Sequence, residues 1–198
     1  MQKRKSVSRK AKLDTTAVVH AAAKLVNAEG LEALSLGRLA EQLGVQTPSL
    51  YNHVDGLPGL QRELALLSTR QLGDRLGNAA IGKSGPGAVL AVAEAYRAYV
   101  KDNPGLYRAG LRSSGQQKRV DAELQSAQEH VVQIALAVVN SFGLQGEDAL
   151  HAVRGLRSVV HGFATLEVAG GFGLPLDCDE SFHRLVNMFI RGLQQTHP

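Results

Sequence analysis

The feature that most restricts the fold of this chain is the stretch SLGRLAEQLGVQTPSLYNHV, residues 35–54, which holds two short helical segments with only a few residues between them. Ser35 can cap the first segment, and Gly44 can take the left-handed conformation that stops a helix. Thr47 can cap the second segment, with Pro48 in its first turn, where a missing backbone N–H costs nothing. A helix this short is unstable alone, so the rest of the fold must support it.

Two short helices joined by a glycine-containing turn predict a helix-turn-helix, whose second helix lies in the major groove of DNA. The apolar positions expected to pack the pair together are Leu36, Leu39, Ala40, Leu43, Val45 and Leu50. The side chains expected to contact bases or phosphates are Gln46, Thr47, Ser49, Tyr51, Asn52 and His53. The alternative is an ordinary helical hairpin within a protein core.

A basic arm precedes the motif. Residues 1–12 contain no acidic residue, and their basic residues are Lys3, Arg4, Lys5, Arg9, Lys10 and Lys12. The net charge of the whole chain is +4, so the arm carries +6 and the remainder −2. We expect residues 1–12 to be a disordered arm that attracts DNA phosphates, with Lys10 and Lys12 among the DNA contacts. A solubilising tail without a partner is the alternative.

The helical spacing of apolar residues continues through almost the whole chain, and strand-like alternation is rare. We therefore predict an all-α fold of about nine helices. Residues 13–56 would form a three-helix DNA-binding unit, and residues 57–198 a larger helical domain for regulation and dimerisation. A fourth helix, opened by Pro58, would join the two, and the glycine-rich stretch 81–87 is the best candidate for a linker.

Composition and motifs argue against several other classes of protein. No apolar run approaches the ~18 residues that a membrane-spanning helix needs, and no apolar segment follows the basic N-terminus as it would in a secretory signal. The single cysteine, Cys178, cannot form an internal disulfide, which suits a cytoplasmic protein. The chain lacks a phosphate-binding loop, a dinucleotide-binding turn, a nucleophile elbow and a His-Glu-x-x-His motif, so we expect neither an enzyme nor a cofactor.

From LDTTAVVHAAAKLVNAEG through LSLGRLAEQLGVQTPSLYNHV to DGLPGLQREL, the chain resembles the DNA-binding domain of the TetR family of bacterial transcriptional regulators. The LGV, Pro and Leu-Tyr-x-His-Val elements are especially similar to the tetracycline repressor branch. The resemblance implies a homodimer on a palindromic operator, in the bacterial cytoplasm at the nucleoid. It also implies that Pro48 meets the DNA together with Gln46, Thr47, Tyr51 and Asn52.

Two positions depart from the family pattern. Leu57 stands where many relatives have a lysine that meets a phosphate, and Gly37 stands where the tetracycline repressor has a base-reading arginine. We expect Arg38, beside Gly37, to contact a phosphate instead, and the basic arm to offset the contact missing at Leu57. The operator sequence of the relatives therefore cannot be carried over.

The segment LRSVVHGFATLEVAGGFGLPLDCDESFHRLVNMFIRGL resembles a C-terminal ligand-sensing domain of some family members, in which Trp-His-Gly is typical. His161 and Gly162 keep two of those three residues, and the chain contains no tryptophan. Apolar residues on the last two helices recur at roughly heptad spacing, which predicts a four-helix dimer core. The predicted interface residues are Val153, Leu156, Val160, Phe163, Phe182, Leu185, Val186 and Phe189. Burial within the same subunit is the alternative.

We expect a pocket for a small-molecule effector among the helices of the larger domain. The candidate lining residues are Tyr96, Tyr99, Tyr107, Phe142, His161 and Phe163, for each of which simple core packing is the alternative. The arginines that could bind an anionic ligand, or be solvated on the surface, are Arg108, Arg112, Arg154 and Arg157. The carboxylates around Cys178 are expected to cap a helix, and no residue set has the spacing of a metal site.

Together these features predict a sequence-specific DNA-binding regulator, most simply a homodimeric repressor that a small molecule releases from its operator. The alternative is a protein with the same helix-turn-helix that binds DNA constitutively, as an architectural factor, or that serves as an interaction module. A cavity on the order of a few hundred Å3 in the larger domain would favour sensing.

Overall fold

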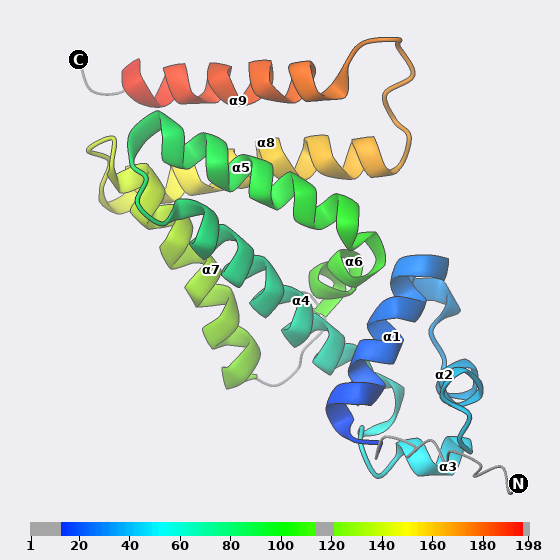
Figure 1. The fold of residues 1–198 in the computed structure, drawn as a ribbon. Helices are drawn as coiled ribbons and strands as arrows, with labels where there is room; N and C mark the ends of the chain where they lie inside the picture. The colour runs from blue at the N-terminus through cyan, green and yellow to red at the C-terminus, as the bar shows by residue number, and fades with distance from the viewer. Residues whose placement is uncertain (1–12, 114–120, 196–198) are drawn as a thin grey trace, which may run out of the picture.

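The computed structural model describes residues 13–113 and 121–195, and in these ranges the chain folds entirely from helices and their connections (Figure 1). The α-helices are α1 (Thr15–Glu29), α2 (Leu36–Leu43), α3 (Thr47–Leu50), α4 (Gly56–Ala80), α5 (Gly85–Asp102), α6 (Pro104–Ser113), α7 (Ala122–Asn140), α8 (Gly146–Val168) and α9 (Cys178–Gln195). A short 3-10 turn, η1 (Leu31–Ala33), follows α1. The all-α prediction is confirmed, and the basic arm with Lys10 and Lys12 lies outside the described residues.

Helices α1 to α3 form a small unit around a hydrophobic core of their own. The predicted caps are in place, because the side chain of Asp14 caps α1 and that of Ser35 caps α2. Gly44 ends α2 with a φ of +65°, a left-handed conformation that a residue with a side chain rarely adopts. This turn brings α3 across α2 within a few residues, as a helix-turn-helix requires.

Helix boundaries differ from the prediction in small ways. Thr47 is the first residue of α3 rather than its cap, and Gln46, which precedes it, makes no side-chain cap bond. Helix α4 begins at Gly56 instead of Pro58. The connection between α4 and α5 is 81–84 rather than 81–87, because Gly85 to Gly87 already belong to α5.

Helix α4 belongs to both parts of the molecule. Near its start, Leu60 and Leu64 are fully buried in the core of the α1–α3 unit. Near its end, Leu76 joins the core of the larger domain, which α4 to α9 build together. In Figure 1 α4 accordingly runs from the α1–α3 unit to the region where α5, α7 and α8 meet.

A second connection between the two parts is the contact of α6 with α1. A Cβ atom on Gly105 would lie 1.8 Å from the carbonyl oxygen of Val26, so the two backbones leave no space for a side chain there. Asn27 bridges the helices: its side-chain amide donates to Asn103 at 3.2 Å, and its side-chain oxygen accepts from the backbone N–H of Leu106 at 2.8 Å. The small unit is therefore held to the larger domain through α6 as well as through α4.

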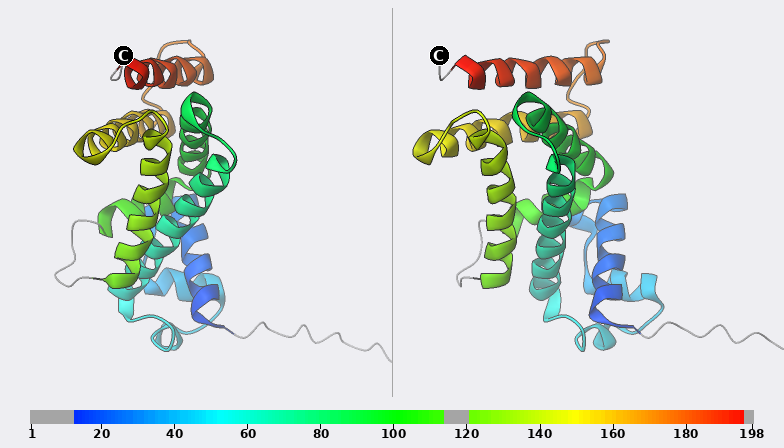
Figure 2. Two further views of the ribbon diagram at one scale, coloured as in Figure 1. Left: turned by 90° about the vertical axis from the view of Figure 1, so that its left-hand side faces the viewer. Right: turned by 60° about the vertical axis from the view of Figure 1, so that its left-hand side comes forward.

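Helices α8 and α9 lie side by side at the end of the molecule far from α3 (Figures 1 and 2). The residues predicted to form a dimer interface on them face the core of their own chain. Those that are buried are Leu156, Val160, Phe163, Phe182 and Val186, and those that are partly buried against the same core are Val153, Leu185 and Phe189. Packing of α8 and α9 on each other and on α5 accounts for the buried members of this set. The partly buried members keep surface that a second copy could contact, so the dimer interface stays a prediction.

We predict that Gly105→Ala lowers the free energy of unfolding by about 1–3 kcal/mol, because α1 and α6 must separate to admit the methyl group. The matched control is Gly87→Ala in α5, where an added Cβ meets nothing within 4 Å. The control should not lose stability, since alanine is the better helix former. Urea unfolding followed by circular dichroism measures both, and equal effects of the two substitutions would show that the α1–α6 contact has room.

Candidate DNA-binding surface and ligand cavity

Helix α3 and the turn after it are anchored by one side chain and present the others to solvent. Leu50 has an exposed fraction of 0%, whereas Tyr51, the next residue, is 61% exposed. Gln46, Pro48 and Asn52 are exposed as well. The outward polar and aromatic side chains are therefore not required for packing within the described part of the chain.

The remaining predicted contact residues of this segment, Thr47, Ser49 and His53, are partly buried. The backbone carbonyl of His53 accepts a hydrogen bond from the hydroxyl of Thr15 at 3.1 Å. This bond ties the end of the segment to the start of α1, so the first helix helps to fix where the exposed side chains of this segment lie.

The two positions that depart from the family pattern have different surroundings. Gly37 is exposed, and a side chain there would meet nothing within 4 Å. Leu57 packs, partly buried, against the core of the α1–α3 unit, so the place of the phosphate-binding lysine is taken by a packing residue. Arg38 forms an exposed ion pair with Glu29, and such a pair is weak enough to be exchanged for a phosphate.

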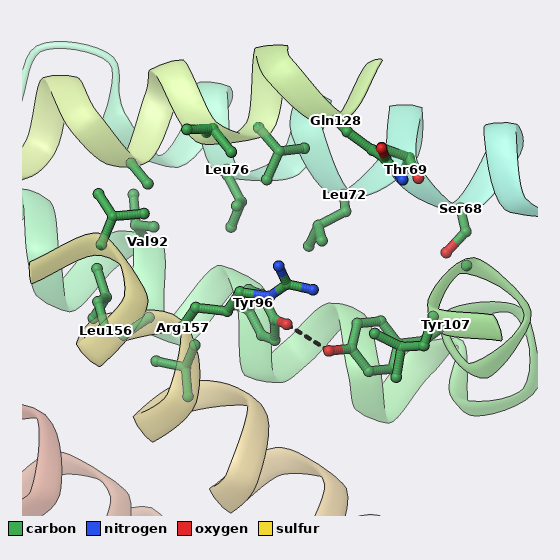
Figure 3. Close-up of a pocket in the computed structure, with 18 residues that line it drawn as sticks. Ser68, Thr69, Leu72, Leu76, Val92, Tyr96, Tyr107, Gln128, Leu156 and Arg157 are labelled. Carbon is green, nitrogen blue, oxygen red and sulfur yellow. Dashed lines mark hydrogen bonds between the residues drawn. The ribbon is translucent and has the colours of Figure 1, made fainter. Parts of the chain in front are cut away.

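A cavity of about 370 Å3, partly open to solvent, lies in the larger domain and is lined by residues of α4, α5, α6, α7 and α8 (Figure 3). Most of its wall is apolar, as at Leu72, Leu76, Val131, Leu156 and Val160. Polar groups come from Ser68, Thr69, Tyr96, Tyr107 and Gln128, and Arg157 brings a positive charge. This volume lies in the range of ~300–1,000 Å3 that is usual for small-molecule sites.

Three ring side chains from three helices form a chain of hydrogen bonds at the cavity. The hydroxyl groups of Tyr96 and Tyr107 bond to each other, and the hydroxyl of Tyr107 bonds to Nδ1 of His161 at 2.5 Å. Burial raises the pKa of both phenols. Burial also lowers the pKa of His161, and the nearby charge of Arg157 adds to this effect. All three groups are thus uncharged at neutral pH.

The structure brings part of the predicted pocket together. Tyr96 and Tyr107 line the cavity, whereas His161 does not line it and bonds to Tyr107 from behind the wall. Three other residues that were predicted to line the cavity do not line it. They pack with the hydrophobic core instead: Tyr99, Phe142 and Phe163.

The sequence analysis missed the contribution of α4 and α7 to the cavity wall. Their lining residues include Ser68, Thr69, Leu72, Gln128 and Val131. Helical periodicity marks the apolar members of this set as inward-facing, but it does not distinguish the wall of a cavity from a filled core.

The carboxylates around Cys178 act as caps and ion-pair partners. Asp177 accepts hydrogen bonds from the backbone N–H groups of Asp179 and Glu180 at 2.6 and 3.2 Å, at the start of α9. Asp179 also pairs with Arg97 at 2.8 Å.

Within the described ranges, no group of three or more His, Cys, Asp or Glu residues could hold a metal ion. No helix in these ranges is long and apolar enough to cross a membrane.

Comparison with known proteins assigns the chain to a family. Residues 18–53 match the bacterial regulatory proteins of the tetR family, and residues 89–189 match the tetracyclin repressor-like C-terminal domain. An uncharacterized HTH-type transcriptional regulator of Mycobacterium tuberculosis is 35% identical over 193 residues, which cover 96% of this chain and 86% of the relative. The chain belongs to the TetR family. It is therefore a transcriptional regulator with a DNA-binding helix-turn-helix and not an enzyme, as the sequence predicted.

Another curated relative and two solved structures extend this likeness. A second uncharacterized HTH-type transcriptional regulator, from Bacillus subtilis, is 34% identical over 176 residues, 89% of this chain and 90% of the relative. A solved structure from Rhodococcus, of unknown function, has a TM-score of 0.82 at 20% identity and covers 96% of this chain and all of its own. A TetR variant from Acinetobacter baumannii in complex with minocycline has a TM-score of 0.70 at 22% identity. The match covers 94% of this chain and 99% of the TetR variant. These structures share the fold, while the Trp-His-Gly type of the C-terminal domain stays a prediction.

We predict that Tyr51→Ala weakens DNA binding while the free energy of unfolding stays within about 0.5 kcal/mol, because the side chain is exposed. The neighbouring control, Leu50→Ala, should cost about 2–5 kcal/mol, because it leaves a hole in the core. Urea unfolding and fluorescence anisotropy on labelled duplex DNA measure the two effects. If Tyr51→Ala destabilised the fold as Leu50→Ala does, Tyr51 would be a packing residue.

We predict that the free energy of unfolding falls on acidification from pH 7.5 to pH 5.5, in part through His161. The pKa of His161 lies below its ordinary value of 6.5 in the folded chain, so the unfolded chain binds this proton more readily. The contribution is complete above pH 6.5 and is lost as the pH falls from there through the lower pKa of the folded chain. Thermal unfolding at both pH values should show a smaller pH effect in His161→Asn than in the wild type. An unchanged pH effect would mean that His161 titrates alike in both states.

Proposed function

We propose that this TetR-family regulator is a homodimeric repressor that binds a palindromic operator and leaves it when a small molecule occupies the cavity. Residues 13–56 would read the DNA, and residues 57–198 would sense the effector and dimerise. We also propose that the protein acts in the bacterial cytoplasm, on the nucleoid. The observation that carries the proposal is that α4 and α6, which hold the α1–α3 unit, also form part of the cavity wall.

Two exposed α3 helices related by a twofold axis would enter successive major grooves of the operator. The residues proposed to contact DNA on this surface are Gln46, Thr47, Pro48, Ser49, Tyr51, Asn52 and His53, with Arg38 on a phosphate. Lys10 and Lys12 would add phosphate contacts from the arm. Since Gly37 offers no side chain, the base read by an arginine in the tetracycline repressor would go unread at this position.

The dimer contact would involve the outer side of α8 and α9. This side and the connection between the two helices expose apolar side chains that their own chain leaves uncovered: Leu150, Leu166, Leu174, Leu176 and Met188. Helices α8 and α9 lie far from α3 (Figure 1), so pairing there would leave both α3 helices free to face the same duplex.

The cavity can influence α3 by two routes. Leu106, whose backbone N–H bonds to Asn27 of α1, is followed directly by Tyr107 of the cavity wall. On α4, Leu64 is fixed in the core of the small unit, one turn before Ser68 and two before Leu72 at the cavity. An effector that binds better to a form with different positions of α4 and α6 would lower the affinity for DNA through that difference alone. The A. baumannii relative, solved in complex with minocycline, supports a small-molecule role for this fold.

The test is a selection of bound fragments from a random duplex library with the full-length protein at near-physiological salt, followed by sequencing. We expect an enriched palindrome whose half-sites lie about 10 base pairs apart, or a multiple of this, because each α3 must face the same side of the duplex. The enriched duplex then serves to screen compounds for release.

The opposite result would be binding to all fragments alike, with strong dependence on salt and no enrichment. That outcome would reject the sequence-specific repressor and favour the architectural or interaction role. An enriched site that no compound releases would reject the sensing step alone.

A further inference from the structure

We propose that the effector is an organic anion, an apolar body ending in a carboxylate, whose charged end binds Arg157 and the hydroxyl of Tyr96. The inference deepens the proposed function, since it takes the cavity to be the effector site. It follows from three properties of the cavity: its apolar wall, its single kind of charge and the direction of its hydrogen bonds.

The apolar wall selects a compact hydrophobic body. Leu72 and Leu76 of α4, Val131 of α7 and Leu156 of α8 surround the space that Figure 3 shows. A volume of about 370 Å3 corresponds to about a dozen water molecules at ~30 Å3 each, so a ligand of similar size fits. Moving an apolar body of this size from water into the cavity is favourable by the hydrophobic effect.

The charge of the cavity selects an anion. Among the described residues that line it, Arg157 is the one that carries a charge, and it forms no ion pair within residues 13–113 and 121–195. Figure 3 shows its guanidinium group extending into the space beside Tyr96 and toward Leu72. A cationic ligand would meet a like charge there, and a neutral one would gain no charge-assisted bond from this exposed guanidinium, which already bonds to Tyr96. A carboxylate would form charge-assisted hydrogen bonds with it.

The other arginines that the sequence suggested for an anion are placed differently. Arg108 and Arg112 of α6 lie near Glu32, at 3.8 and 2.8 Å, outside the cavity lining. Arg154, three residues before Arg157 on α8, does not line the cavity, whereas Arg157 does, although both side chains are exposed. Arg157 is thus the arginine that the fold brings to the apolar wall.

The hydrogen-bond chain can supply a second donor to an anion. When Nδ1 of neutral His161 carries the proton, it donates to the Tyr107 oxygen, and the Tyr107 hydroxyl donates to the Tyr96 oxygen. The Tyr96 hydroxyl is then free to donate to a carboxylate beside Arg157. The other tautomer of His161 reverses the chain, so an anion would select the first one.

The experiment measures the binding of decanoate, decan-1-ol and decylammonium to the full-length protein by isothermal titration calorimetry, below their micellar concentrations. All three probes have ten carbon atoms and differ in the charge of the head group, and the alkyl part of decanoate is one methylene shorter, which works against the expected preference. We expect decanoate to bind at least about tenfold more tightly than decan-1-ol, because a hydrogen bond to a charged group is the stronger one. Decylammonium should bind most weakly.

Variants locate the charge effect. Arg157→Gln should weaken decanoate binding about tenfold and leave decan-1-ol binding unchanged, because only the charge-assisted bonds are lost. Arg154→Gln is the matched control on the same helix and should bind all three probes as the wild type does. Arg157→Lys keeps the charge and should restore part of the preference. Circular dichroism checks that each variant folds.

Equal binding of decanoate and decan-1-ol, no binding of any probe, or an unchanged preference in Arg157→Gln would overturn the proposal. Binding is measured without DNA, so the result is independent of the repressor mechanism. If decanoate binds through Arg157 but does not release the selected operator, the ligand class stands and the proposed sensing function fails.

Discussion

The fold depends on one helix that belongs to two hydrophobic cores. Helix α4 has 25 residues and is about 38 Å long at 1.5 Å per residue. It fixes Leu60 and Leu64 in the core of the α1–α3 unit and Leu76 in the core of the larger domain. Helix α3 has only four residues and cannot be stable by itself. The position of the exposed side chains of α3 is therefore set by packing that α4 shares with the larger domain.

In the larger domain, a charged group joins three helices at one point. Arg97 of α5 is 8% exposed, donates to both carboxylate oxygens of Glu167 on α8 at 2.7 and 2.6 Å, and pairs with Asp179 of α9. Its guanidinium lies over the rings of Phe163 and Phe182, so α5, α8 and α9 are joined by charge and by ring contacts at one point. The cavity lies between this group and α4, α6 and α7.

The helix-turn-helix could be predicted from the sequence because local signals specify it. Ser35, Gly44 and Pro48 fix helix ends whatever surrounds them, and the family likeness is concentrated in the same residues. The partners of buried residues could not be predicted in this way. The spacing of Phe182 and Val186 shows that they are buried, but the same pattern fits a dimer core and the core of one chain. Only some of the residues that line the cavity could be predicted, for the same reason. Tyr96 at the cavity wall and Tyr99 in the core lie on one face of the same helix, so their spacing does not tell them apart.

The central claim is that the cavity and α3 are coupled through α4 and α6. The most direct measurement is the distance between spin labels at Glu41→Cys in the two subunits, in a Cys178→Ser background, by pulsed electron paramagnetic resonance. The account predicts one distance distribution in the complex with the selected operator and a shifted one when the cavity is saturated with decanoate or with the best releasing compound. Identical distributions in the two states would contradict the account, because the DNA-binding units would then not move with the cavity.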